Sequence, residues 1–490
     1  MKRFQLAFLF LIFLPTLASA QLFKESAEPD SNQSVVYIGS YDWGACVEKF
    51  VVNVGHQISP QVIRAKDFEI SRVLYPKNAG IGVTKGSLSV TDAFCSDSMG
   101  RQIPSPSNFI TIITDVHPKA EHSNPFVSIT LGSFRSYYGY KIENEKLDIS
   151  VKNIKAFVSK NVSKFKIQTF SCIVPASDEE KENPKYKEEN LTISYASYIP
   201  NTSDSESQKI PLILWFHGLK EGGSNIYDVL MGVKANALAD EQIQSYFKDG
   251  VAILAPQSKS SWLESNEKGI GGVRYWTPVD KNAPVDKIKK PLEKFLSKIL
   301  VTEDKPKKEK IPFAAESFYT EPIKALLDEF IAEHPNIDTK RIYVGGCSAG
   351  GYMTMNMLIK YPEVFAAAFP ICEYYLDSKI TDGQIKELAK KPLWFTYALN
   401  DGTVNSQKNS IATIERLKAA GAEKLHVSEF RNVVDKSGLY LSDRSASPKD
   451  ESYGLPYEYD GHESWIYLFN DQCMDGETKL FSWLSEQKNP

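Results

Sequence analysis

The chain has 490 residues, of which 42% are hydrophobic and 24% are charged, and its formal net charge at pH 7 is -4. This length exceeds what one hydrophobic core usually serves, so we expect two domains. The composition is that of a globular protein. A slightly negative charge gives no electrostatic reason to expect a nucleic acid or an anionic membrane as a partner.

The N-terminus has the pattern of a secretory signal peptide over residues 1–20. Met1-Lys2-Arg3 is a positively charged start, residues 6–14 are apolar, and Ala18-Ser19-Ala20 is a small-residue cleavage site. The mature chain would then begin at Gln21. The apolar run is too short to cross a bilayer, and no later apolar run is long enough. We therefore expect an exported protein, secreted or periplasmic, without stable membrane insertion.

Residues 21–175 predict an all-β domain. Short runs rich in β-branched and aromatic residues alternate with turn residues, and no long helical period interrupts them; examples are 34–38, 50–54, 109–113 and 126–131. This spacing is typical of an antiparallel sandwich. Disulfides are possible in an exported chain, and Cys46 and Cys95 of this region are a plausible pair. The charged, Pro-containing residues 176–190 then predict a linker.

Residues 191–490 predict an α/β domain, with a mostly parallel sheet and helices on both faces. Continuous apolar runs at 210–216 and 251–256 are typical of strands buried on both sides. Further strands are expected at 365–369, 392–399 and 425–430, with one helix starting near Pro322 and ending before Pro335 and a last helix at 480–484. Residues 277–312 are a Lys- and Pro-rich insertion. Because its lysines are interleaved with acids, we interpret it as a solvated loop rather than a polyanion site.

A glycine-flanked serine stands between a predicted strand and a predicted helix. Gly346-Cys347-Ser348-Ala349-Gly350 follows the β-branched run 341–344 and precedes a helical stretch at 349–360. Strand, serine turn and helix are the context of a nucleophile elbow. The glycines let the strand and the helix approach closely, and the serine hydroxyl is left exposed above the N-terminal N–H groups of the helix. Ser348 is therefore the predicted nucleophile.

A serine hydroxyl needs an imidazole to take its proton and a carboxylate to orient that imidazole. Beyond Ser348 the chain has two histidines. His426 alternates within a predicted strand, whereas His462 follows a glycine in a predicted loop, so His462 is the expected base. Asp401 comes directly after the predicted strand 392–399 and is the preferred acid. The alternatives are the other aspartates after the serine: Asp377, Asp382, Asp435, Asp443, Asp450 and Asp460.

The negative charge that develops on a carbonyl oxygen needs preorganised N–H donors. We expect one from the backbone of Ala349 and one from Leu219, in the loop after the strand 210–216, with His217 as a structural residue of that loop. Three tryptophans are candidates for substrate binding, with ordinary packing as the alternative: Trp262, Trp276 and Trp465. The chain has no CxxC and no His/Cys spacing typical of a metal site, and the chemistry needs no cofactor.

Several stretches resemble the serine α/β-hydrolases of the prolyl-oligopeptidase-like, polyhydroxybutyrate-depolymerase-like and feruloyl-esterase-like group, above all the exported esterases often labelled "predicted peptidase". The matching stretches are 211–218, 255–257 with Trp262, 337–343, 346–351 and 461–465. Some members carry an immunoglobulin-like domain before the hydrolase, and residues 41–45 with the β-rich region here are similar. The group usually has a His-Gly sequence in the acid strand, whereas this chain has Ala398-Leu399-Asn400-Asp401.

The resemblance implies an α/β-hydrolase fold and an exported serine esterase that cleaves a small-molecule or polymer ester through an acyl-enzyme on Ser348. A serine peptidase with the same three residues is the alternative, although the N-terminal region is too short for the propeller of prolyl oligopeptidases. A secreted binding protein with an inactive hydrolase fold is a further alternative. The sequence does not predict the oligomeric state.

Overall fold

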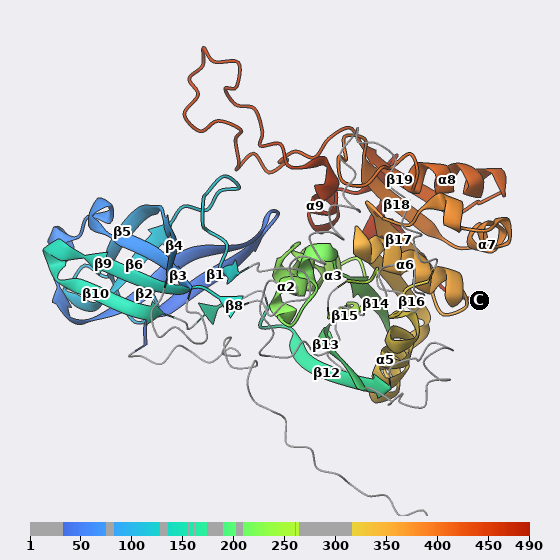
Figure 1. Ribbon diagram of the computed structural model, residues 1–490, viewed down its shortest axis with the longest axis horizontal. Helices are drawn as coiled ribbons and strands as arrows, with labels where there is room; N and C mark the ends of the chain where they lie inside the picture. Colours follow the sequence, from blue (N-terminus) through green and yellow to red (C-terminus); the bar gives the residue numbers. More distant parts are fainter. Residues whose placement is uncertain are drawn as a thin grey trace, which may run out of the picture.

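The computed structural model describes residues 33–74, 83–127, 136–154, 157–159, 162–173, 190–201, 209–259, 261–263 and 316–490. These segments form an all-β N-terminal region and a larger α/β region (Figure 1). The predicted signal peptide, almost all of the predicted linker and the 277–312 insertion lie outside the described residues. No helix in the described segments is long and apolar enough to span a membrane.

The N-terminal region consists mainly of two sheets, with strand orders β11-β1-β2-β6-β5 and β10-β9-β3-β4. The strands are β1 (Val35–Tyr41), β2 (Gly44–Ile58), β3 (Glu69–Leu74), β4 (Val83–Leu88), β5 (Val90–Ser96), β6 (Ser107–Thr114), β9 (Gly139–Asn144), β10 (Ile149–Ile154) and β11 (Phe157–Val158), with a small β7 (Phe126–Val127) and β8 (Ser136–Tyr137) pair. The rings of Phe50 in β2 and Tyr140 in β9 meet between the two sheets, 5.1 Å apart. A two-sheet, all-β region is thus confirmed, while the immunoglobulin-like resemblance stays a prediction.

The α/β region is organised around an eight-stranded sheet of order β12-β13-β15-β14-β16-β17-β18-β19. Its strands are β12 (Lys166–Ile173), β13 (Asn190–Tyr198), β14 (Ile210–Phe216), β15 (Ala252–Gln257), β16 (Ile337–Cys347), β17 (Ala367–Ile371), β18 (Leu393–Ala398) and β19 (Leu425–Phe430). The first two pairings, of β12 with β13 and of β13 with β15, are antiparallel, and all the others are parallel.

The predicted domain boundary at residue 175 differs from the structure, because β12 is an edge strand of the large sheet. Its residues alternate between exposed and half-buried positions, with Phe170 buried. An edge strand of this kind has the same period-2 pattern as a strand of a β-sandwich, so the pattern alone does not assign it to a sheet. The register with β13, from Lys166 opposite Ser197 to Ile173 opposite Asn190, decides the assignment.

Helices cover both faces of the large sheet (Figure 1). They are α2 (Ile226–Met231), α3 (Glu241–Gln244), α5 (Thr320–Glu333), α6 (Ala349–Lys360), α7 (Asp382–Leu388), α8 (Ser410–Ala419), α9 (Trp465–Phe469) and α10 (Leu480–Glu486). In β14, Ile213 and Trp215 pack in the same core as α2, α9 and α10, whereas the alternate residues Leu212 and Leu214 pack in the same core as α5 and α6. Burial on both faces explains why this strand is continuously apolar.

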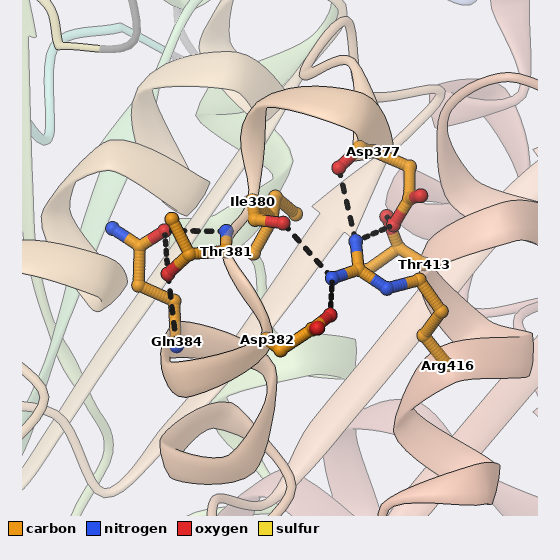
Figure 2. Close-up of polar contacts among 7 residues, drawn as sticks. All are labelled: Asp377, Ile380, Thr381, Asp382, Gln384, Thr413 and Arg416. Atoms are coloured by element: carbon orange, nitrogen blue, oxygen red, sulfur yellow. Dashed lines mark hydrogen bonds and ion pairs between the residues drawn. The ribbon is translucent and has the colours of Figure 1, made fainter.

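A polar network joins α7 to α8, the two helices that follow β17 and β18 (Figure 2). The Arg416 guanidinium on α8 donates to the Asp377 side chain at 2.9 Å, to the Ile380 carbonyl at 2.9 Å and to the Asp382 side chain at 2.7 Å. A capping box between Thr381 and Gln384 begins α7. These bonds hold the start of α7 and the residues before it against α8.

Candidate active site

Ser348 occupies a strained turn between β16 and α6. Its φ of 57° and ψ of -116° are unusual for a residue with a side chain. A Cβ at Gly346 would lie 2.5 Å from the carbonyl oxygen of Gly350, and a Cβ at Gly350 would lie 2.6 Å from that of His217. Only glycine leaves room for such close packing of strand and helix. The structure therefore has the elbow geometry that the sequence predicts.

The His462 side chain joins Ser348 to Asp401. His462 Nε2 lies 2.8 Å from Ser348 Oγ, and His462 Nδ1 lies 2.8 Å from Asp401 Oδ2. An ionised carboxylate only accepts hydrogen bonds, so the proton of a neutral imidazole belongs on Nδ1 and Nε2 is free to accept the serine proton. The structure thus brings together the three residues that the sequence analysis selects.

The Asp401 carboxylate is held in the turn after β18. Its side chain is 2% exposed, and Oδ1 accepts the N–H groups of Thr403 and Val404, each at 2.8 Å. The second oxygen, Oδ2, is left for His462. Because both oxygens have fixed partners, the carboxylate presents one lone-pair direction to the imidazole. The rival aspartates have other partners; Asp460, for example, accepts the backbone N–H of His462 at 2.9 Å.

The predicted oxyanion donors lie on two adjacent strand ends. Ala349 is the first residue of α6, where backbone N–H groups have no partner within the helix. Leu219 begins a single 3-10 turn, η4 (Leu219–Glu221), after β14, which pairs with β16. A Cβ at Gly218 would lie 3.6 Å from Cys347 Sγ, so the η4 turn lies against the residue that precedes Ser348. The roles of Ala349 and Leu219 as donors stay predictions.

His217 is fully buried next to the η4 turn and contacts the residue that precedes it. Its Nδ1 lies 2.6 Å from the carbonyl oxygen of Gly218, and its Nε2 accepts the backbone N–H of Ser258 at 3.1 Å. Since Nε2 accepts, the ring proton is on Nδ1 and is donated to Gly218. The structural role expected for His217 is confirmed, and it extends to orienting the peptide that precedes Leu219.

Trp262 differs from its predicted substrate-binding role. It is 0% exposed, its indole N–H donates to the His217 carbonyl at 3.0 Å, and its ring packs against Phe216 and Tyr319. A side chain with no exposed surface packs beside the η4 turn rather than touching a ligand. Trp276 lies outside the described residues.

Trp465 lies beside His462. Its ring meets that of His462 edge-on, with centroids 5.5 Å apart, and the residue is partly exposed. This contact limits how the imidazole can tilt. Substrate binding by Trp465 stays a prediction.

Two glutamates near the site were not selected from the sequence. Burial raises the pKa of the Glu373 carboxyl well above its usual value, and its Oε1 accepts a hydrogen bond from the Ser410 hydroxyl at 3.1 Å. Burial also raises the pKa of Glu463, next to His462, to about 7, although Lys220 nearby acts in the opposite direction. Glutamates are common in loops, so the sequence carries only a weak signal for either residue.

A cluster of three His, Cys, Asp or Glu side chains suited to a metal ion is absent from the described segments.

The predicted pairing of Cys46 with Cys95 is wrong, because both thiols are free and buried. Cys46 Sγ lies 3.5 Å from the Val47 carbonyl, and Cys95 Sγ lies 3.1 Å from the Ile58 carbonyl. Cys46 is on β2 and Cys95 is on β5 of the same sheet, and β6 lies between these two strands. The two cysteines are therefore too far apart to form a disulfide.

Parts of the chain are similar to known proteins. The model of the prolyl oligopeptidase family matches residues 320–424, which include the elbow and Asp401. A poly(3-hydroxyalkanoate) depolymerase C from Paucimonas lemoignei is 51% identical over 49 residues, which cover 10% of this chain and 12% of that relative. The chain thus matches about an eighth of the length of this curated relative.

One solved structure resembles nearly the whole chain. It is described as a crystal structure of a thermostable esterase, with a TM-score of 0.57 and 20% identity, and the match covers 93% of this chain and 99% of the other. At this identity the likeness demonstrates a common fold. The fold of the larger region is an α/β-hydrolase fold, and together with the family match over the elbow it supports a serine hydrolase of the α/β-hydrolase type.

Proposed function

We propose that this protein is an exported carboxylic-ester hydrolase that forms an acyl-enzyme on Ser348. The single observation that carries this proposal is the position of His462, whose two ring nitrogens lie 2.8 Å from Ser348 Oγ and 2.8 Å from Asp401 Oδ2. A neutral imidazole held at both nitrogens is prepared to accept a proton from the serine and to return it to a leaving group.

In the first half of the reaction, Ser348 Oγ attacks the ester carbonyl carbon while His462 Nε2 takes the hydroxyl proton. The imidazolium that forms is stabilised by Asp401, which keeps its negative charge. The carbonyl oxygen becomes an oxyanion and accepts the backbone N–H groups of Ala349 and Leu219. A single donor of this kind is typically worth about 2.7–4 kcal/mol in the transition state.

Collapse of this intermediate breaks the bond to the alcohol oxygen, which receives the proton from His462 and leaves. Water then attacks the acyl-enzyme, again with His462 as the base. The serine is released, with the carboxylic acid as second product. The reaction needs no cofactor, and every proton moves through one ring nitrogen.

The ester assignment is supported by two likenesses and one structural fact. A relative of similar fold is described as a thermostable esterase, and a short segment is similar to a depolymerase named for poly(3-hydroxyalkanoate). The described N-terminal segments form mainly a five-stranded and a four-stranded sheet, unlike the propeller of prolyl oligopeptidases. The match to the prolyl oligopeptidase family over residues 320–424 keeps a serine peptidase as the second candidate.

The test is a side-by-side rate assay on short and long p-nitrophenyl esters, feruloyl esters and aminoacyl-proline anilides, with Ser348→Ala as the blank. We expect ester turnover that depends on Ser348 and negligible anilide cleavage. Anilide cleavage without ester turnover would establish the peptidase instead. If folded protein hydrolyses neither and a fluorophosphonate does not label Ser348, the chain is a binding protein with a hydrolase fold.

Export is a part of the proposal that rests on residues 1–20 alone. Mass determination of the protein recovered from the periplasm or the culture medium tests it. A mature chain that starts at Gln21 is expected, and a full-length chain retained in the cytoplasm would refute export.

A further inference from the structure

The N-terminal region contacts both segments that flank His462. The segment before it, residues 431–459, follows β19 and leads into Asp460; we call it the arm. In Figure 1 the arm extends as a long orange-red loop between β19 and α9. The segment after His462 is α9, which ends at Phe469. Any constraint on these two segments acts on the loop that carries the imidazole.

The outgoing and returning halves of the arm are paired along much of their length. Tyr459 N–H donates to the Val433 carbonyl at 2.8 Å, and Asp435 N–H donates to the Tyr457 carbonyl at 2.8 Å. Farther out, Tyr457 N–H donates to the Tyr440 carbonyl at 2.9 Å. The pairing continues to Tyr459, which directly precedes Asp460, the residue that accepts the His462 N–H. This backbone pairing links the outer arm to the loop that carries His462.

The outer arm is bound to the N-terminal region by an ion pair and an aromatic contact. The two terminal nitrogens of Arg444, Nη1 and Nη2, donate to the two Asp115 carboxylate oxygens, each at 2.8 Å, and this bidentate geometry is directional and strong. The Trp43 ring packs edge-on against Tyr440, with centroids 4.8 Å apart. Lys119 also donates to the Ser442 carbonyl.

The other flank of His462 is held by Asp42, which neighbours Trp43 in the turn between β1 and β2. Both carboxylate oxygens of Asp42 accept from the Asn470 amide at 3.0 Å, and Oδ1 also accepts from Lys234 at 2.8 Å. Asn470 is the C-cap of α9. The Asp42 side chain is only 10% exposed, so water competes little for these bonds.

We propose that Asp42, together with the Asp115–Arg444 pair, positions His462, so that the N-terminal region is a working part of the active site. This inference rests on the proposed function and adds positioning residues to it. The imidazole must stay within hydrogen-bond distance of Ser348 and Asp401 at once, and a misplacement of about 1 Å can lower a rate about a hundredfold. Asp42 and Asp115 directly follow β1 and β6, two strands of one sheet, and their contacts on the two sides of the loop oppose such a movement.

The first experiment compares Asp42→Ala with a matched control, Asp67→Ala. Asp67 lies in the same N-terminal region, is 14% exposed and accepts from Lys146 at 2.7 Å, but this ion pair lies wholly within that region. We expect kcat on a short ester to fall about tenfold in Asp42→Ala with little change in KM, and to stay within about twofold of the wild type in the control. Equal kcat values for the two folded variants would overturn the proposal.

The second experiment reverses the Asp115–Arg444 ion pair, whose side chains are 15% and 55% exposed. Asp115→Arg and Arg444→Asp should each lower kcat, and the double variant should recover most of the loss because the attraction is restored. A double variant as slow as the two single losses combined would overturn the role of this pair. Charge reversal keeps a polar side chain at each position and leaves no cavity, so these variants are expected to fold even if Asp42→Ala does not.

Hydrogen exchange of the amides of residues 457–470 measures positioning without catalysis. We expect faster exchange in Asp42→Ala and in both single ion-pair variants, and wild-type exchange in Asp67→Ala and in the double variant. If the wild type lacks ester turnover, the proposed function fails while the exchange experiment still decides the positioning. Unchanged exchange in all variants would refute it.

Discussion

Gly461 lies against the backbone of Asn400, so that a Cβ at position 461 would be 2.5 Å from the Asn400 carbonyl oxygen. The loop that carries His462 thus touches the loop that carries Asp401. A side chain at position 461 would separate His462 from the Asp401 carboxylate, 2.8 Å away.

We therefore expect Gly461→Ala to lower kcat at least about tenfold, with a smaller effect on KM, because a shift of the imidazole raises the barrier without removing substrate contacts. Steady-state kinetics on a short p-nitrophenyl ester measure this. Gly402→Ala is the matched control: a Cβ there meets nothing within 4 Å, and wild-type activity is expected. A fully active Gly461→Ala enzyme would contradict the geometry.

Asp401→Asn should lower kcat about 10⁴-fold and leave the fold intact. The Asn amide can donate to His462 Nδ1, which moves the ring proton to Nε2, and Nε2 can then no longer accept the serine proton. Single-turnover kinetics and circular dichroism separate this loss from unfolding. Asp328→Asn on α5, where the side chain is 59% exposed, should be as active as the wild type. An Asp401→Asn rate within tenfold of the wild type would assign the acid to another aspartate.

Glu463 should make stability depend on pH. Burial raises its pKa to about 7, above the usual value of 4.5, so the carboxyl ionises at a lower pH in the unfolded chain than in the folded protein. The contribution of this carboxyl to the free energy of unfolding is therefore fully present below about pH 4.5 and is lost as the pH rises through 7. Glu463→Gln should therefore have a Tm about 2 °C or more above the wild type at pH 8, and this advantage should disappear at pH 4.5.

Differential scanning calorimetry at the two pH values measures this difference. Glu477→Gln, at an exposed position after β20 (Met474–Asp475), is the control and should behave as the wild type at both pH values. The same Tm difference for Glu463→Gln at pH 4.5 and pH 8 would contradict the expected titration.

Arg416→Met should lower the free energy of unfolding by about 1–3 kcal/mol, because Asp377, 15% exposed, loses a charged partner and the Ile380 carbonyl loses a donor (Figure 2). Denaturant titration measures the change. The control is Lys390→Met, which breaks a pair whose side chains are 66% and 61% exposed; a loss of at most about 1 kcal/mol is expected. Equal losses would mean that the α7–α8 network contributes no more than a surface pair.

Local sequence was sufficient where a feature depends on neighbours along the chain. The strand at 210–216 was predicted at the bounds of β14, because burial on both faces makes every residue apolar. The elbow was predicted because a strained serine turn needs glycines two residues before and two residues after it. Helix α5 ends at Glu333, before Pro335, as proline geometry demands.

Local sequence does not predict a feature that depends on which other segment a strand pairs with or a side chain packs against. The edge strand β12 has the pattern of a sandwich strand, and only pairing with β13 assigns it to the large sheet. A tryptophan such as Trp262 is a reasonable candidate for ligand binding from its residue type alone. Only the packing of Phe216, His217 and Tyr319 around its ring makes it a buried packing residue.

The elbow, the α/β class and the candidates Ser348, Asp401 and His462 can all be predicted from local sequence patterns. The folded arrangement adds that these three residues meet, and that Asp42 and Asp115 of the N-terminal region contact the segments around His462. The physical reason is the distance along the chain: His462 is 114 residues from Ser348, and Arg444 is 329 residues from Asp115. Contacts across such spans depend on strand order and packing, which no local pattern encodes.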